Sequence, residues 1–144
     1  MFSSNDWHLY CGSGLYEWKV ENGILNMSLT LNSTQDEYFM LQREFPLDKI
    51  GYPISLKVRF KTQGQAVHFG IEAYDSNNNC LGRVISWKQI TDWRTMECHL
   101  PSKTACIRVF IDDVSNSASI GNVNVLIDWI EVASYHWSRY DEET

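Results

Sequence analysis

Charged and hydrogen-bonding side chains recur at alternate positions in several stretches of the sequence. His68, Glu72 and Tyr74 alternate with apolar residues, and alternate side chains of a β-strand point to the same face. Arg59 and Arg108 show the same alternation in two other stretches. If the three strands are neighbours, these groups line one face and can exchange hydrogen bonds with the hydroxyl groups of a sugar. The alternative is an ordinary solvated face with weak ion pairs.

The tryptophans are a second group of residues that could contact a ligand. Trp87 lies between Ser86 and Lys88 in a polar segment, where burial explains a large ring poorly. Trp18 fits either a groove or the core, Trp93 favours the core, and Trp129 favours packing in the core or on the sheet. Aromatic rings have apolar faces that can cover the C–H face of a sugar. We therefore expect an aromatic-lined groove on one sheet face, with Trp87 and Trp18 as candidate binding residues.

The elements that must position these residues are β-strands. Apolar and polar residues alternate with a period of two over 54–61, and the same rhythm recurs along most of the chain, whereas helical periodicity is nearly absent. The pattern predicts an all-β, antiparallel β-sandwich (jelly roll) of about eight to ten strands. The segments expected to form strands include 25–31, 37–45, 54–61, 67–74, 81–87, 96–100, 107–111 and 123–132.

Length and charge limit the organisation of the chain. The 144 residues suit one domain, which we place at 1–137, followed by a polar tail at 138–144. The net charge of −6 disfavours nucleic acid and an anionic membrane surface as partners. No apolar run is long enough to span a bilayer. The four cysteines form no CxxC pair, and we expect free thiols.

The start of the sequence carries no export signal. It lacks the basic start and apolar stretch of a signal peptide. Three expectations follow: the protein stays inside the cell, belongs to a longer exported chain, or leaves the cell by lysis.

The chain contains, in order, a Trp-bearing segment at 18–25, a hairpin at 74–82, Asp92-Trp93-Arg94, and strands at 107–111 and 121–132. This order resembles that of the jelly-roll carbohydrate-binding modules of the galactose-binding-like superfamily, with a module carried by a phage tail protein as one candidate. The resemblance spans about residues 5–134. It implies a polysaccharide or cell-surface glycan as partner, and an extracellular or virion location as part of a larger protein.

The resemblance also implies one structural calcium ion where the first and last strands meet. The matching residue is Asp128, an acid within an otherwise apolar strand, with Asp6 or Asn5 as a further ligand. A lone buried carboxylate is costly, so a cation or hydrogen bonds must satisfy it. Hydrogen bonding of Asp128 without an ion is the alternative.

Three functions fit the sequence. The first is a non-catalytic carbohydrate-binding module that recognises a polysaccharide or cell-wall glycan. The second is an adhesion or host-recognition module of a phage tail protein that binds host cell-wall saccharide. The third, less favoured, is a small glycan-active enzyme in which Glu72 pairs with Glu97 or Glu44, because glycosidases place two carboxylates ~5–10 Å apart. The sequence contains no hydrolase, phosphate-loop or zinc-protease motif, and we expect no catalysis.

Overall fold

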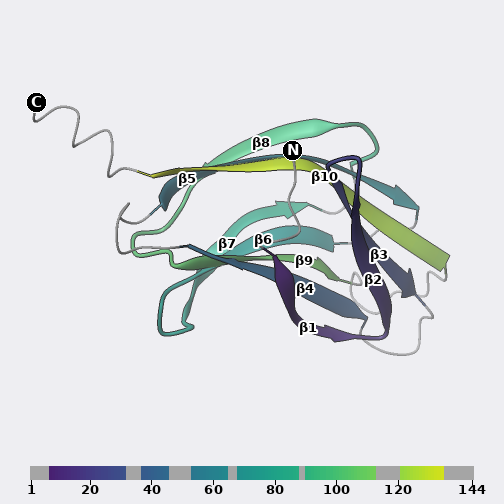
Figure 1. Ribbon diagram of the computed structural model, residues 1–144, viewed down its shortest axis with the longest axis horizontal. Helices are drawn as coiled ribbons and strands as arrows, with labels where there is room; N and C mark the ends of the chain where they lie inside the picture. The colour runs from purple at the N-terminus through teal and green to yellow at the C-terminus, as the bar shows by residue number, and fades with distance from the viewer. Residues whose placement is uncertain are drawn as a thin grey trace, which may run out of the picture.

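The computed structural model describes residues 7–31, 37–45, 53–64, 68–87, 90–112 and 121–134. These residues form two facing layers of β-strands and no helix, which confirms the predicted β-sandwich (Figure 1). The ten strands are β1 (His8–Ser13), β2 (Leu15–Glu21), β3 (Ile24–Leu31), β4 (Tyr38–Glu44), β5 (Pro53–Gly64), β6 (His68–Tyr74), β7 (Cys80–Trp87), β8 (Arg94–His99), β9 (Cys106–Asp112) and β10 (Gly121–Ser134).

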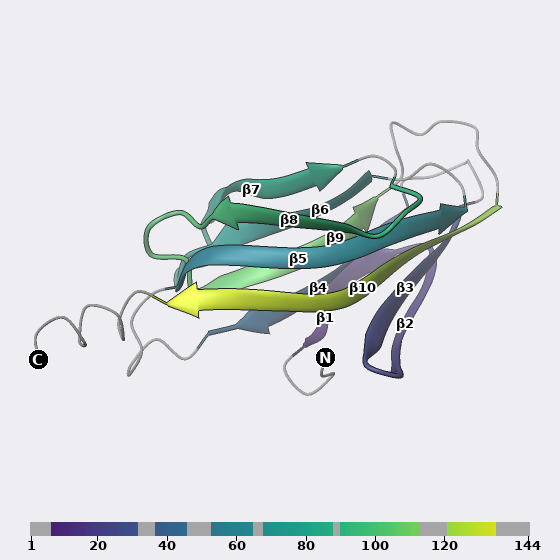
Figure 2. The same cartoon turned by 90° about the horizontal axis from the view of Figure 1, so that it is seen from above.

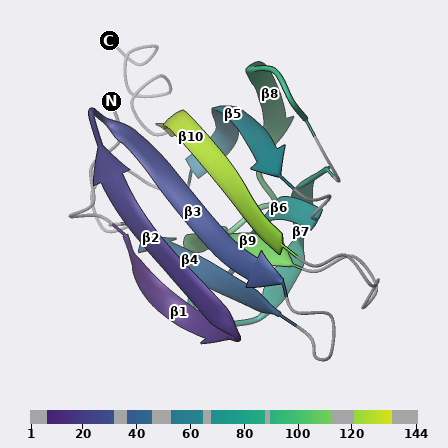
Figure 3. The same ribbon diagram turned by 90° about the vertical axis from the view of Figure 1, so that its right-hand side faces the viewer.

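The ten strands divide equally between two antiparallel sheets. The first sheet has the order β1-β4-β9-β6-β7, and the second has the order β2-β3-β10-β5-β8. Figure 2 shows the second sheet in front of the first, and Figure 3 shows β2, β3, β10, β5 and β8 side by side. Strands from distant parts of the sequence are therefore neighbours, such as β9 between β4 and β6.

The core lies between the two sheets and follows the alternation in the sequence. Along β3 every second residue, from Leu25 to Leu31, is buried, whereas the residues between them are partly exposed. The rings of Phe60 on the second sheet and Phe69 on the first lie 4.6 Å apart, centroid to centroid. Apolar side chains of two facing sheets interdigitate in this way, so the opposite face of each sheet is left to polar residues.

A β-bulge in β10 changes the side-chain pattern that the sequence predicts. The register with β5 shifts between Ile127 and Trp129, so that Trp129 pairs with Arg59 while Ile130 pairs with the buried Val58. A bulge adds one residue to one strand, so the side chains that follow it point to the opposite face of the sheet from the one that regular alternation predicts. Trp129 therefore lies on the outer face, where it is partly buried, and of its two predicted positions the one in the core is wrong.

All four cysteines are free, as predicted, and burial raises the pKa of the Cys11, Cys98 and Cys106 thiols.

Residues 1–6 and 135–144 lie outside the described residues, so the tail at 138–144 stays a prediction. No helix in the described part is long and apolar enough to cross a membrane.

The contact between the sheets gives a first testable prediction. We expect Phe60→Ala to lower the free energy of unfolding by about 3–5 kcal/mol, because it removes a fully buried ring and leaves a cavity. Thr95→Ala on the exposed face of β8 is the control and should change stability by less than about 0.5 kcal/mol. Urea unfolding measures both, and equal effects of the two substitutions would contradict this packing.

Candidate functional site

The outer face of the first sheet gathers most of the residues that the sequence singled out. His68, Glu72 and Tyr74 share this face of β6, because Phe69, Ile71 and Ala73 point into the core. On the neighbouring strand β9, Arg108 is the register partner of Glu72. The expected grouping of His68, Glu72, Tyr74 and Arg108 is therefore present in the structure.

Arg108 is at the centre of this face, between two tyrosine rings. Its guanidinium carbon lies 3.5 Å from the ring centroid of Tyr10 and 3.7 Å from that of Tyr74. The side chain is buried, and only 4% of the residue is exposed. Stacking on aromatic rings and the attraction of a cation to ring faces stabilise this arrangement. The three side chains form what we call the Arg108 stack.

Amide side chains fix the orientation of the guanidinium. Arg108 Nε donates a hydrogen bond of 2.7 Å to Gln42 Oε1, and Arg108 Nη2 donates to Asn78 Oδ1. Gln42 Nε2 in turn donates to Glu44 Oε1 at 3.2 Å. Among the described residues no carboxylate forms a salt bridge with Arg108. A buried cation that lacks an ionic partner is costly unless rings and amides offset the loss of water, and these contacts reduce the cost of burying Arg108.

Tyr74 connects the Arg108 stack to a second group of charges. Its hydroxyl donates to Glu72 Oε1 at 2.9 Å, and the other oxygen of Glu72 accepts from Arg83 Nη2 at 3.1 Å. Burial and the hydrogen bond to Glu72 raise the pKa of Tyr74 to about 12. Both oxygens of Glu72 are therefore engaged by neighbouring side chains.

Phe110, two residues after Arg108 on β9, occupies the next position along this face. Arg83 lies over the Phe110 ring, 4.6 Å from its centroid, and the ring of His68 meets it edge-on at 5.5 Å. Gly70 makes room for this ring, because a Cβ at that position would lie 2.5 Å from Phe110 Cζ. His68 Nε2 is also hydrogen-bonded to Ser86 Oγ at 2.6 Å. The result is a continuous band of rings and charges from Tyr10 to His68.

A hollow of about 410 Å³ adjoins Arg108 at the end of this band. Its lining comes from β4, β9 and the loop between β6 and β7, and comprises Gln42, Glu44, Phe45, Asp75, Ser76, Asn78, Ala105, Cys106 and Arg108. The hollow combines guanidinium donors with carboxylate acceptors. Hydroxyl groups both donate and accept hydrogen bonds, so this lining suits a polyhydroxylated ligand.

The loop that closes one side of the hollow is a tight hairpin turn. Asp75 Oδ1 accepts hydrogen bonds from the backbone N–H groups of Asn77 and Asn79, at 2.9 and 2.8 Å. These bonds lower the pKa of Asp75. They are typical of an aspartate that caps a turn, and they hold Asn78 where it accepts from Arg108.

Three of the predicted binding residues lie elsewhere. Arg59 is on the second sheet, where its Nε lies 3.3 Å from Asp128 Oδ2 and its guanidinium carbon lies 5.2 Å from the Trp93 ring centroid. It therefore does not share a face with Arg108, because β5 and β9 belong to different sheets. The expected neighbourhood of these two arginines is wrong.

The two candidate tryptophans also lie off the outer face of the first sheet. Trp87 is the register partner of the core residue Phe69 and packs partly against the core. With Trp93 and Arg94 it lines a hollow of about 290 Å³ where the edge strands β7 and β8 approach each other. Trp18 of β2 is the register partner of Met27 of β3, and it also packs partly against the core.

The predicted calcium ligands are not gathered in the described part of the chain. Asp128 lies in the β10 bulge with 38% of its side chain exposed, and Arg59 balances its charge. It is therefore not the buried carboxylate that the apolar strand suggested. No group of three acidic, histidine or cysteine side chains among the described residues could hold a metal ion. Asp6 lies outside the described residues, and a calcium ion stays a prediction.

Sequence reasoning missed several residues of this face. Gln42 and Phe110 could have been found, because both follow the alternation of β4 and β9. Tyr10 could not, because the register of β1 shifts between Leu9 and Cys11 and no local pattern marks that bulge. Asn78 has a positive φ of 68° in the turn, and its contact with Arg108 depends on the arrangement of distant strands.

Comparison with known proteins identifies neighbours by structure alone. No protein-family model matches the sequence, and no curated protein matches it. A variant of a carbohydrate-binding module of family 29 matches with a TM-score of 0.59 and 16% identity, over 90% of this chain and 82% of that chain. Another variant of this family, complexed with mannohexaose, matches with a TM-score of 0.58, 16% identity and the same coverage.

A phage protein has a similar fold in part of its length. The enzymatically active domain of tailspike protein 4 from bacteriophage CBA120 matches with a TM-score of 0.56 and 11% identity, over 92% of this chain and 20% of that chain. At such identities the likeness concerns the fold. The predicted resemblance to jelly-roll carbohydrate-binding modules is confirmed at that level.

The raised pKa of Tyr74 gives a prediction about pH. An unfolded tyrosine ionises near pH 10, whereas folded Tyr74 ionises at about pH 12. The folded state therefore holds this proton more tightly, and the resulting stabilisation is present below pH 10 and is lost as the pH rises towards 12. We expect Tyr74→Phe to reduce the fall in stability between these pH values, measured by urea unfolding.

The control for this experiment is Tyr16→Phe, because the Tyr16 ring stacks on Phe39 and its hydroxyl has no hydrogen-bond partner among the described side chains. Identical pH profiles for Tyr74→Phe and the wild type would contradict the raised pKa of Tyr74.

Proposed function

We propose that this protein is a non-catalytic carbohydrate-binding module that binds a polysaccharide or cell-wall glycan on the outer face of its first sheet. The Arg108 stack is the observation that supports this most directly. It places a guanidinium beside a hollow, between two rings, of which Tyr10 is 42% exposed. The similarity in fold to modules of family 29 supports the same function.

The chemistry of the face matches the two surfaces of a sugar. Tyr10 offers an exposed ring to the apolar C–H face. Arg108 can donate hydrogen bonds to hydroxyl oxygens, and Glu44 can accept from hydroxyl hydrogens in the same hollow. Because Gln42 and Asn78 already orient the guanidinium, binding needs little further ordering of this group.

The positions of the carboxylates disfavour a glycosidase. Glu97 lies on β8 of the second sheet, with Lys57 as its register partner, whereas Glu72 and Glu44 belong to the first sheet. Glu72 and Glu97 therefore cannot flank one glycosidic bond. Glu72 is also engaged by Tyr74 and Arg83. A paired acid and base of the glycosidase kind needs two carboxylates facing one sugar.

A second candidate context is a virion. The match to a bacteriophage tailspike covers 20% of that chain, which is the size relation expected of a module within a larger protein. In this reading the same face binds host cell-wall saccharide as an adhesion or host-recognition module, and the location is extracellular or virion. The net charge of −6 favours neither nucleic acid nor an anionic membrane as partner.

Tyr10 provides the test of this function. We expect the wild type to bind at least one soluble glycan in a broad panel, and Tyr10→Ala to bind it about five- to thirtyfold more weakly, a loss of about 1–2 kcal/mol for one aromatic contact. Isothermal titration calorimetry measures both affinities.

Tyr10→Phe is the matched control, because it keeps the ring over Arg108 and should bind within about twofold of the wild type. Urea unfolding of all three proteins separates lost binding from lost stability. A wild type that binds no glycan, or a Tyr10→Ala variant that binds as tightly as the wild type, would contradict the proposal.

A further inference from the structure

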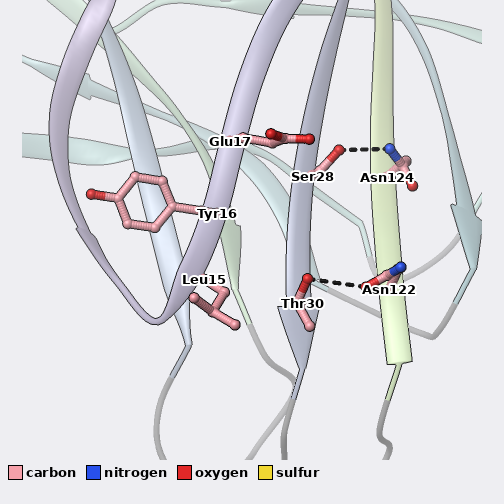
Figure 4. A pocket seen from close by; sticks show the side chains of 7 residues that line it. All are labelled: Leu15, Tyr16, Glu17, Ser28, Thr30, Asn122 and Asn124. Carbon is pink, nitrogen blue, oxygen red and sulfur yellow. Dashed lines mark hydrogen bonds between the residues drawn. The ribbon is translucent and has the colours of Figure 1, made fainter.

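A second hollow, of about 500 Å³, lies on the outer face of the second sheet. It is formed where β2, β3 and β10 are adjacent, and Figure 4 shows the side chains that line it. Amide and hydroxyl side chains make up most of the lining. Its principal residues are Leu15, Glu17, Ser28, Thr30, Asn122 and Asn124.

The strand registers arrange these side chains in two rows across the sheet. One row pairs Glu17 with Ser28 and Ser28 with Asn124. The next row pairs Leu15 with Thr30, and Thr30 with Asn122. Alternate residues of β3 are fully buried, so every member of these rows points outward. The two rows therefore form one polar surface that spans three strands.

Hydrogen bonds within each row, and one to Asn26 of β3, hold these side chains in position. Asn124 Nδ2 donates to Ser28 Oγ at 2.7 Å and to Asn26 Oδ1 at 2.8 Å, so both of its hydrogens are used. Thr30 Oγ1 donates to Asn122 Oδ1 at 3.0 Å. These bonds order the side chains before any ligand arrives, which lowers the entropic cost of binding.

The same bonds leave other groups available to a ligand. Among the described side chains, none accepts a hydrogen bond from Asn122 Nδ2 and none donates to Asn124 Oδ1. Glu17 adds a carboxylate acceptor, and Leu15 adds an apolar side chain that is 64% exposed. The surface thus offers donors, acceptors and one apolar contact within a single hollow.

The charge of the hollow selects the class of ligand. Glu17 is its one charged lining residue in the described part of the chain. The next charges along β2, Lys19 and Glu21, pair with each other at 2.7 Å. An anionic sugar would meet the negative charge of Glu17 with no cation in the lining to offset it. The fit is to a neutral ligand rich in hydroxyl groups.

We propose that this hollow is a second binding site, for a neutral saccharide, on the sheet opposite the Arg108 stack. The inference shares its ligand class with the proposed function and uses none of the same residues. Because the two sites lie on the outer faces of opposite sheets, one stretch of glycan cannot occupy both. The protein is therefore bivalent, and it links two glycan chains or two segments of one chain.

Bead agglutination tests bivalency directly. Beads coated with a neutral polysaccharide that the wild type binds, chosen from mannan, xylan, mixed-linkage β-glucan and galactan, are mixed with four proteins. These are the wild type, Tyr10→Ala, the double variant Asn122→Ala/Asn124→Ala, and Thr95→Ala as a control on the exposed face of β8. A further variant, Thr30→Arg, fills the hollow with a long side chain if the double variant does not fold.

We expect the wild type and Thr95→Ala to agglutinate the beads. The variants Tyr10→Ala and Asn122→Ala/Asn124→Ala should each bind the beads, with at least about fivefold weaker overall binding, and should not agglutinate them. Agglutination and binding by Asn122→Ala/Asn124→Ala at the wild-type level would overturn the second site and leave the first intact.

The remaining outcomes separate the two proposals. If Tyr10→Ala behaves as the wild type while Asn122→Ala/Asn124→Ala loses all binding, the second site is supported and the first-sheet site is overturned. If the wild type binds none of the four polysaccharides, the second site is overturned, and the broad glycan panel decides the first site separately.

Discussion

A buried guanidinium between two tyrosine rings is the interaction on which this face of the protein depends. Arg108 has no salt-bridge partner among the described residues, and two rings and two amide side chains take the place of water around it. That arrangement requires β1, β4, β6 and β9 to contribute to one small area, together with the turn that carries Asn78. Removing any partner would leave a buried charge less well satisfied, which is far more costly than losing a surface contact.

Two irregularities in the strands decide which side chains reach which face. The bulge in β1 interrupts the regular register with β4 at Tyr10, and the Tyr10 ring lies over Arg108. The bulge in β10 turns Trp129 to the outer face and brings Asp128 to Arg59. Bulges re-aim side chains where a regular ladder would bury them. Each of these irregularities therefore creates a charge or ring contact that regular alternation would not give.

The sequence predicted the sandwich, the strands from β3 to β10 and half of the face, but not β1 and β2. Alternation is a local property, so it was sufficient to place His68, Glu72, Tyr74 and Arg108 outward. It could not tell that β5 and β9 lie in different sheets, and it therefore grouped Arg59 with Arg108. Nor could it show that Trp87, at the end of β7, approaches Trp93 from the other sheet. Strand order, bulges and turn contacts depend on residues far apart in the chain, and a local pattern does not contain them.

Binding on the first sheet as proposed requires that Arg108 is held rigidly between its rings before any ligand binds. Proton NMR of the arginine Nε–H group tests this most directly, because buried, hydrogen-bonded protons exchange slowly with water. A rigid Arg108 gives one sharp Nε–H resonance that persists at pH values where the resonances of exposed arginines are broadened by exchange. An Arg108 Nε–H that exchanges as fast as those of exposed arginines would contradict this rigidity.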